Sequence, residues 1–163
     1  MENVEIYGEY KFKNYKNLSY DEKQIALIFR NKNKSWMIDN NDIKLEDHLD
    51  WCERLKVNNN QIYYLVFKNG IPFMSIDYHD IDKDAKEAYW GYFLGRDGYS
   101  SEVLKIEKII IEIAFTKLGL KKLLCLNDVN NHVIKIHKFF GFKEAEIIEI
   151  NGRKFQKMYK EKD

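Results

Sequence analysis

The stretch "YFLGRDGYSSEVLKIEKIII", residues 92–111, decides how this chain folds. An aromatic segment runs into a turn rich in glycine and serine, and an isoleucine-rich segment follows, with Ile106, Ile109 and Ile110 at helical spacing. The pattern predicts a strand that ends at the start of a helix. Unpaired backbone N–H groups and the positive end of the helix dipole would make that start suitable for a phosphate.

The residues of the turn leave two interpretations open. Gly95 and Gly98 would let a ligand approach the backbone closely, and Ser100 and Ser101 could cap the helix or donate to phosphate oxygens. The turn is not a Walker loop, because no Gly-Lys-Ser/Thr closes it, and its glycine spacing is wrong for a dinucleotide-binding fingerprint. A phosphate site and an ordinary capped turn fit these residues equally well.

The segments on either side predict one α/β domain over residues 1–163. Ser19 and Glu22 have the spacing of a capping box, Asn69-Gly70 suits a type I′ hairpin turn, and Gly119 ends the helix of the opening stretch. Strands are expected at 4–12, 61–68, 71–79, 88–94, 121–127, 142–150 and 153–160, and helices at 19–31, 44–57, 100–118 and 130–140. This order predicts an α/β (α+β) fold with a mixed, twisted sheet of about seven strands and about four helices.

Composition excludes several classes of protein. Lys+Arg 27 nearly balances Asp+Glu 26, so a nucleic-acid partner is not expected. No apolar run has the length of a membrane span, and the N-terminus does not resemble a signal peptide, so we expect a cytoplasmic protein without a membrane partner. Cys52 and Cys125 should be buried free thiols, and the four histidines lack the spacing of metal ligands.

A second motif supplies a family resemblance. Residues 130–142 read Asn-x-x-Val-x-x-x-His-x-x-x-Gly-Phe, and with the turn "GRDGYS" they resemble the Gcn5-related N-acetyltransferases. In that superfamily a loop of the form Gln/Arg-x-x-Gly-x-Gly/Ala holds the pyrophosphate of acetyl-coenzyme A. Gly98 matches this pattern, whereas Gly95 stands where Gln or Arg is usual and Ser100 replaces the second small residue.

The resemblance implies a cofactor site, a splayed pair of central strands and direct transfer of the acetyl group. Strand 88–94 would separate from the strand that begins after Lys121, and a backbone N–H near Phe93 would stabilise the oxyanion. The residues implied for acetyl-coenzyme A are Phe93, Leu94, Gly95, Arg96, Gly98, Tyr99, Ser100, Ser101 and Asn130.

Two histidines are implied in proton transfer. His137 occupies the position of the family's tyrosine near the thioester sulfur, where an imidazolium could protonate the leaving thiolate. An isolated histidine here would more often be a polar residue on an amphipathic helix, and only its position in the motif favours a role near the sulfur. His79 ends the middle strand of the meander and is the candidate base, acting through water, although a surface histidine at a strand end is an equal interpretation.

Closer similarity suggests the acceptor. "FRNKNKSWM" (29–37), "HLDW" (48–51) and "YYLVFKNG" (63–70) resemble the branch that acetylates the 4-amino group of a UDP-linked 4-amino-4,6-dideoxy-N-acetyl-altrosamine in pseudaminic acid synthesis. By this resemblance Arg30 and His48 would contact the nucleotide, and Tyr78 and Tyr92 would border the sugar. The alternatives are a cation at a helix C-terminus for Arg30, a solvated histidine for His48, and packing for the tyrosines.

Other functions remain open at this level. "GYSSE" and "LGLKKLL" fit an enzyme that acetylates protein N-termini or another small amine. The replacement of the family's tyrosine by His137 leaves room for a coenzyme-binding regulator without catalysis. Either a monomer or a homodimer is compatible with the sequence.

Overall fold

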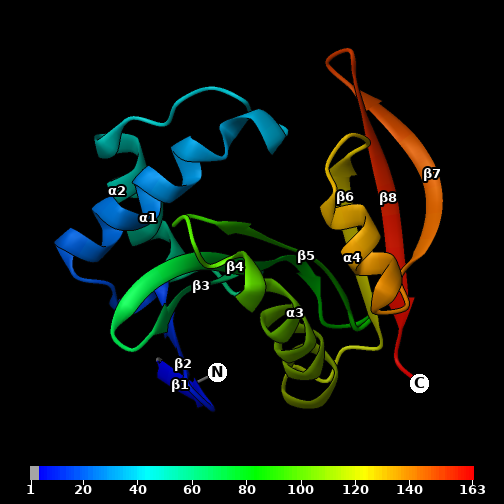
Figure 1. Ribbon diagram of the computed structural model, residues 1–163, viewed down its shortest axis with the longest axis horizontal. Coiled ribbons are helices and arrows are strands. Elements are labelled where there is room, and N and C mark those ends of the chain that lie inside the picture. Colours follow the sequence, from blue (N-terminus) through cyan, green and yellow to red (C-terminus); the bar gives the residue numbers. More distant parts are fainter. Residues whose placement is uncertain (1–3) are drawn as a thin grey trace.

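The computed structural model describes residues 4–163 as a single mixed sheet with helices on both faces (Figure 1). Eight strands lie in the order β1-β2-β3-β4-β5-β6-β8-β7. They are β1 (Val4–Tyr7), β2 (Tyr10–Asn14), β3 (Ile62–Lys68), β4 (Ile71–Asp82), β5 (Glu87–Leu94), β6 (Lys122–Asp128), β7 (Lys143–Ile150) and β8 (Arg153–Glu161). The predicted fold class is confirmed, with one strand more than expected.

The additional strand comes from the N-terminal segment. The sequence predicted one continuous strand over 4–12, but the chain turns at Gly8, whose φ is 61°, and forms the antiparallel hairpin β1–β2. A positive φ is easily adopted by glycine, so this residue breaks a segment whose alternating pattern alone suggests continuity.

The helices follow their sequence signals closely. They are α1 (Tyr20–Lys32), α2 (Leu45–Leu55), α3 (Val103–Glu112) and α4 (Val133–Phe139), and α3 continues through a π-helical turn at Ile113–Lys117. The predicted capping box is confirmed: Ser19 Oγ accepts the N–H of Glu22 at 3.2 Å, and Glu22 Oε1 accepts the N–H of Ser19 at 2.9 Å. Two orphan N–H groups are thereby satisfied at the start of α1.

Both Asn-Gly hairpin turns are confirmed. Asn69 and Gly70 have φ of 52° and 76°, and Asn151 and Gly152 have φ of 51° and 77°. Positive φ at both central positions is the mark of a type I′ turn, which matches the twist of the flanking strands. These turns set the registers of β3 with β4 and of β7 with β8.

Two hydrophobic clusters form the core, one on each face of the sheet. The larger cluster joins β-strand residues such as Phe73, Ile76 and Trp90 to Ile106 and Ile110 of α3. The smaller cluster joins residues of β3 to α1 and α2, and includes Phe29 of α1 and Cys52 of α2. Each face of the sheet is therefore covered by different helices, and Cys52 and Cys125 are buried free thiols, as expected.

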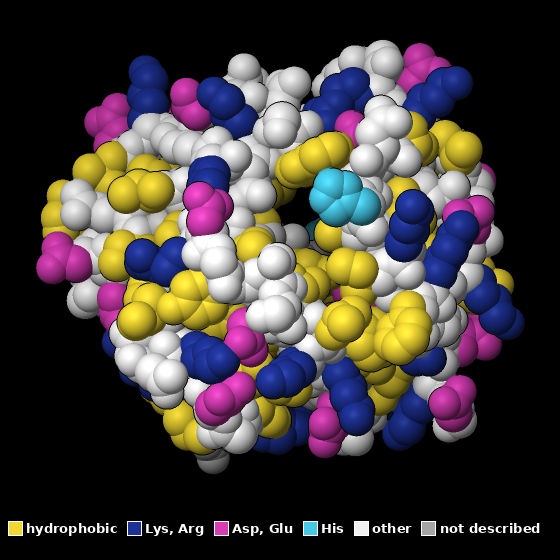
Figure 2. Space-filling model, viewed as in Figure 1, with side chains coloured by type: hydrophobic (Ala, Val, Ile, Leu, Met, Phe, Trp, Pro, Cys, Tyr) yellow, Lys and Arg dark blue, Asp and Glu magenta, His cyan; other side chains and the backbone are white. Residues whose placement is uncertain are grey.

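The centre of the sheet is split. Strand β5 pairs in parallel with β6 over only three residues, Glu87–Tyr89 opposite Lys122–Leu124. Its antiparallel pairing with β4, in contrast, continues to Leu94. Beyond Tyr89 the strands β5 and β6 diverge, and β6, β8, β7 and α4 stand apart from the rest in Figure 1. Figure 2 shows a deep hollow on this face between the part that carries α1 and the part that carries α4, with a histidine side chain at its rim. The predicted splay is thus present.

None of the helices in residues 4–163 is long and apolar enough to cross a bilayer.

Candidate functional site

The loop between β5 and α3 presents unpaired backbone donors beside the splay. The N–H of Gly95 donates to Phe73 O at 2.8 Å, and that of Glu102 donates to Tyr99 O at 3.0 Å. Between them, the N–H groups of residues 96–101 find no acceptor within residues 4–163. A run of free N–H groups in front of a ten-residue helix is an anion-binding arrangement.

Contacts from α1 and β4 hold this loop in place. Asn33 donates its side-chain N–H to Leu94 O at 2.9 Å, and Lys32 Nζ lies 3.0 Å from Asp97 Oδ1. On the other side, Arg96 Nε donates to Pro72 O at 2.9 Å. The free donors are therefore displayed on a fixed backbone, which lowers the entropic cost of binding an anion.

The departure of Gly95 from the family pattern has a steric cause. A Cβ on Gly95 would lie 2.0 Å from Cγ of Phe29, an α1 residue that is buried in the cluster shared with α2 and β3. No side chain fits at this position while Phe29 is present. In contrast, a Cβ on Gly98 would meet nothing within 4 Å, and Gly98 is required instead by its φ of +87°.

We expect Gly95→Ala to destabilise the fold by about 3 kcal/mol, because overpacking against an aromatic ring forces the backbone to move. Urea unfolding would measure the change. In a Phe29→Ala background, where the ring is absent, the same substitution should cost much less. Equal costs in the two backgrounds would show that the ring is not the cause.

Glu102, the acidic residue at the start of α3, does not prevent an anion from binding at the donor loop. Glu102 accepts hydrogen bonds from the hydroxyl of Tyr10 and from Lys68 Nζ, the latter at 2.5 Å. The hydrogen bond from Lys68 lowers the pKa of Glu102 below its usual value. Its negative charge is thus balanced by a lysine, and the positive end of the helix stays available.

On the α3 face of β5, a buried carboxylate holds His137. Glu107 of α3 is 0% exposed and His137 of α4 is 3% exposed; Nδ1 of His137 lies 2.8 Å from Glu107 Oε1. The hydroxyl of Tyr92 donates to the same oxygen at 2.9 Å, and the ring of Trp90 lies 4.8 Å from the imidazole. Within residues 4–163, Nε2 of His137 has no hydrogen-bond partner, so one ring nitrogen is oriented and the other is free.

On the opposite face, Asp77 holds His79. Asp77 Oδ2 lies 2.5 Å from Nδ1 of His79, and β4 pairs Asp77 with Gly91 of β5. A Cβ on Gly91 would lie 3.4 Å from Asp77 Oδ1, so the glycine leaves space over the carboxylate. Asp77 was not predicted as a site residue, although its spacing of two residues from His79 places both on one face of a strand.

The surroundings of His79 favour its protonated form. Burial lowers the pKa of His79, but the hydrogen bond and charge of Asp77, together with the charge of Asp80, outweigh this effect and raise the pKa above its usual value. An imidazole with a raised pKa and an oriented Nδ1 is a stronger base than a free histidine.

The geometry of β5 shows which backbone donors face the splay. The N–H of Gly95 points toward β4, where it donates to Phe73 O. Because backbone groups alternate along a strand, the N–H of Phe93 also points toward β4, and those of Tyr92 and Leu94 point toward the splay. A backbone oxyanion donor in this part of β5 would therefore come from Tyr92 or Leu94, on either side of the predicted Phe93.

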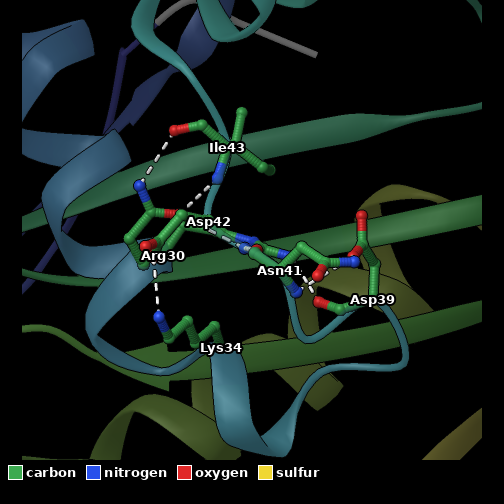
Figure 3. A network of polar contacts seen from close by, with 7 residues as sticks. Arg30, Lys34, Asp39, Asn41, Asp42 and Ile43 are labelled. Atoms are coloured by element: carbon green, nitrogen blue, oxygen red, sulfur yellow. Dashed lines mark hydrogen bonds and ion pairs between the residues drawn. The ribbon is translucent and has the colours of Figure 1, made fainter.

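Arg30 is engaged by its own chain. Its guanidinium donates to the carbonyl oxygens of Asp39 and Asn41, and Asn31 exchanges hydrogen bonds with the backbone of Ile43 at 2.9 and 3.0 Å (Figure 3). An ion pair of 3.0 Å between Lys34 and Asp42 closes the same loop. Arg30 thus anchors the connection between α1 and α2, and its donors face that loop.

Arg153, which the sequence analysis did not single out, attaches this loop to the other half of the sheet. It donates to Met37 O at 2.6 Å and to Ser35 O at 2.9 Å, and it pairs with Asp128 of β6 at 3.1 Å. The α1–α2 connection therefore reaches across from α1 to β6 and β8. No feature of the sequence pattern indicated this contact, because residues 35–38 and 153 lie far apart in the chain.

Of three further predicted residues, two are buried in the core and one is exposed in a turn. His48 is 3% exposed and its Nε2 lies 2.9 Å from Lys23 O, and Tyr78 is in the core with its hydroxyl donating to Ile110 O. Neither side chain can reach a ligand without rearrangement of the core. Asn130 is exposed in the turn before α4, where its N–H donates to Asp128 Oδ1 at 2.9 Å.

No group of histidine, cysteine, aspartate and glutamate side chains in residues 4–163 has the arrangement of a metal site.

The split sheet, the donor loop before α3 and the helix α4 facing the splay define the fold of the Gcn5-related N-acetyltransferases. Among solved structures, the N-acetyltransferase PseH of Campylobacter jejuni is 24% identical, with a TM-score of 0.75 over 95% of this chain and 99% of that chain. The same enzyme in complex with acetyl coenzyme A gives a TM-score of 0.73. Spermidine N-acetyltransferase of Vibrio cholerae, in complex with CoA and spermine, is 13% identical, with a TM-score of 0.83 over 95% of this chain and 96% of that chain. No family model and no curated protein sequence matches the chain.

Proposed function

We propose that this protein is an N-acetyltransferase that uses acetyl-coenzyme A as the acetyl donor. The observation that carries the proposal is the run of free N–H groups at residues 96–101, which lies beside the splay and before α3. These groups would hold the pyrophosphate, and the pantetheine arm would lie along the edge of β5. The fold supports this placement, since the similar Campylobacter enzyme has been solved with acetyl coenzyme A.

The two carboxylate–histidine pairs supply the proton transfers that acetyl transfer needs. The neutral form of His79, oriented by Asp77, would accept a proton from the amine, directly or through water. The N–H groups of Tyr92 and Leu94 would stabilise the developing oxyanion. His137, oriented by Glu107, would give a proton from Nε2 to the leaving thiolate. The two pairs lie on opposite faces of β5, so the base and the acid would act from different sides of the bound thioester.

Transfer would be direct, without an acyl-enzyme. Cys52 is 0% exposed and Cys125 is 2% exposed, so neither thiol can reach a thioester. Burial raises the pKa of Cys125 to about 12, which keeps it as an unreactive thiol.

The acceptor we propose is the 4-amino group of a UDP-linked amino-dideoxy sugar, as in the pathway to pseudaminic acid and flagellin glycosylation. Support comes from the segments 29–37, 48–51 and 63–70 and from the likeness to PseH. On the face of the sheet that carries His79, Trp51 and Tyr63 pack edge to face at 4.7 Å and are partly exposed, which suits stacking on a sugar or base. A protein N-terminus or another small amine is the alternative acceptor.

A thiol-release assay would test the proposal. We expect release of coenzyme A from acetyl-coenzyme A only when an amine is present, with a UDP-4-amino sugar giving a kcat/KM at least tenfold above those of spermidine and an N-terminal peptide. Preference for the peptide or the polyamine would overturn the sugar assignment alone. Coenzyme binding without release for any amine would indicate a non-catalytic coenzyme-binding protein.

A further inference from the structure

A second cavity lies at the opposite end of the sheet from the donor loop. Its volume is about 540 Å³, and it is bounded by the end of β2, the start of β3, the turn between β4 and β5, and the segment after the π-helical turn. Lys86 of its lining precedes the start of β5, whereas the donor loop follows the end of β5. At about 3.3 Å per residue, the eight residues of β5 separate the two places by roughly 26 Å.

An irregularity in β4 shapes this cavity. The register of β4 with β5 shifts between His79 and Asp82, and Asp80 has a φ of 49°. As a result, the N–H of Ile81 turns away from β5 and donates to Asn60 O at 3.1 Å. The end of β4 thereby bends toward the loop before β3, and Ile81 becomes part of the cavity wall. Bulges of this kind often re-aim side chains next to sites.

The charged lining is entirely positive. Lys16, Lys83 and Lys86 line the cavity, and none of them forms an ion pair within residues 4–163. No aspartate or glutamate belongs to the lining. The nearby carboxylate of Asp82 is already used within the β4–β5 turn, where its Oδ1 accepts hydrogen bonds from the N–H groups of Asp84 and Ala85. A cavity with unpaired cations and no lining carboxylate attracts anions.

A buried amide adds a fixed donor. Asn14 lines the cavity although it is only 5% exposed. Its Oδ1 accepts the N–H of Lys16 at 3.0 Å, which orients the side chain and leaves the amide N–H₂ without a partner among residues 4–163. Asn58 and Gln61 place further amide groups in the lining. The N–H₂ group of Asn14 is open to the cavity, where it can donate to the oxygens of an anion.

The remaining wall is apolar. Ile62, Ile81, Leu118 and Leu120 contribute aliphatic side chains opposite the polar ones. From the unpaired lysines, the oriented amide and this wall together, we propose that the cavity binds a small organic anion, a phosphate or carboxylate borne on an apolar group. The proposal does not depend on the acetyltransferase function, because the cavity shares no residue with the donor loop or the two histidine pairs.

Titration of the full chain, followed by ¹⁵N–¹H NMR, would test this site with phenyl phosphate as the probe. We expect shifts at the backbone N–H of Gly119 and at the side-chain amides of Asn14, Asn58 and Gln61, which line the cavity. Benzoate in place of phenyl phosphate distinguishes a carboxylate preference from a phosphate one. Inorganic phosphate should bind at least fivefold more weakly, and phenol should cause no shift. Signals of residues 96–101 report separately on the donor loop.

A matched pair of variants decides the role of the lysines. Lys16→Gln/Lys83→Gln/Lys86→Gln should weaken phenyl phosphate binding at least tenfold with an unchanged melting temperature. Lys108→Gln/Lys143→Gln, which removes exposed lysines outside the cavity, should leave binding within twofold. Shifts that avoid the cavity residues, binding by phenol, or equal weakening in both variants would each refute the proposal.

Discussion

Replacing His79 by asparagine is expected to lower kcat for acetyl transfer by about 10²–10³-fold, the usual contribution of a positioned general base. Asparagine keeps an N–H donor for Asp77 but cannot accept a proton at neutral pH. Steady-state thiol release would measure the loss, and calorimetry should find unchanged binding of coenzyme A. A kcat within threefold of the parent enzyme would remove His79 from the mechanism.

Asp77→Asn tests the same pair through its pH dependence. The rate should rise with pH as His79 loses its proton, and Asp77 raises the pKa of that histidine. Without the Asp77 charge the pKa falls, so the rising limb of kcat/KM should move to lower pH. The plateau should also fall, because the imidazole is less basic and less well oriented.

Asp80→Asn is the matched control. It removes a charge that also raises the pKa of His79, and asparagine tolerates the φ of 49° at this position. In Asp80→Asn, the rising limb of kcat/KM should also move to lower pH, but by less than in Asp77→Asn. A purely structural role for Asp77 would lower the rate without moving the limb.

Replacing His137 by asparagine is expected to lower kcat by about 10²–10⁴-fold with acetyl-coenzyme A, since departure of the thiolate would lose its proton donor. Coenzyme binding should persist, because the donor loop is not altered. Loss of the ring contacts with Trp90 at 4.8 Å and Phe142 at 5.7 Å should also cost about 1–3 kcal/mol of stability. Assays therefore belong well below the melting temperature of the variant.

Glu107→Gln distinguishes orientation from simple packing. Glutamine can still bond Nδ1 of His137 or the hydroxyl of Tyr92, but it removes the negative charge beside the imidazole. We expect a loss of about tenfold in kcat, and a double variant with His137→Asn no slower than His137→Asn alone, because residues that act as a unit are not additive. Fully additive losses would show that Glu107 acts independently of His137.

Local signals in the sequence were sufficient for much of the fold. The capping box at Ser19 and Glu22 and the two Asn-Gly turns depend on residues a few positions apart, and each is present. The helix after the Gly-Ser turn begins at Val103, and it carries the isoleucines whose spacing predicted it. Where the expectation was wrong, at Gly8, a single positive φ outweighed an alternating pattern that extended across it.

The candidate site was only partly visible in the sequence. His79 and His137 were selected, but their partners Asp77 and Glu107 were not. Asp77 could have been found, since residues two apart share a face of a strand. Glu107 could not, because α3 and α4 are separate helices and only their packing brings its carboxylate within 2.8 Å of His137. His48 and Tyr78 show the converse case, in which burial removes residues that a linear motif suggests.

By itself, the sequence determined all of the long helices and all of the strands except the β1–β2 hairpin, together with the exposed donors at the end of β5, because helix caps, turns and periodicity act over a few residues. Tertiary structure alone decided which side chains from distant parts of the chain meet: Phe29 against Gly95, Arg153 on the α1–α2 loop, and Glu107 beside His137. These contacts depend on how the sheet splits and which helices cover its faces. The splitting of the sheet and the placing of the helices are properties of the whole packed core, which the spacing of residues along the chain does not predict.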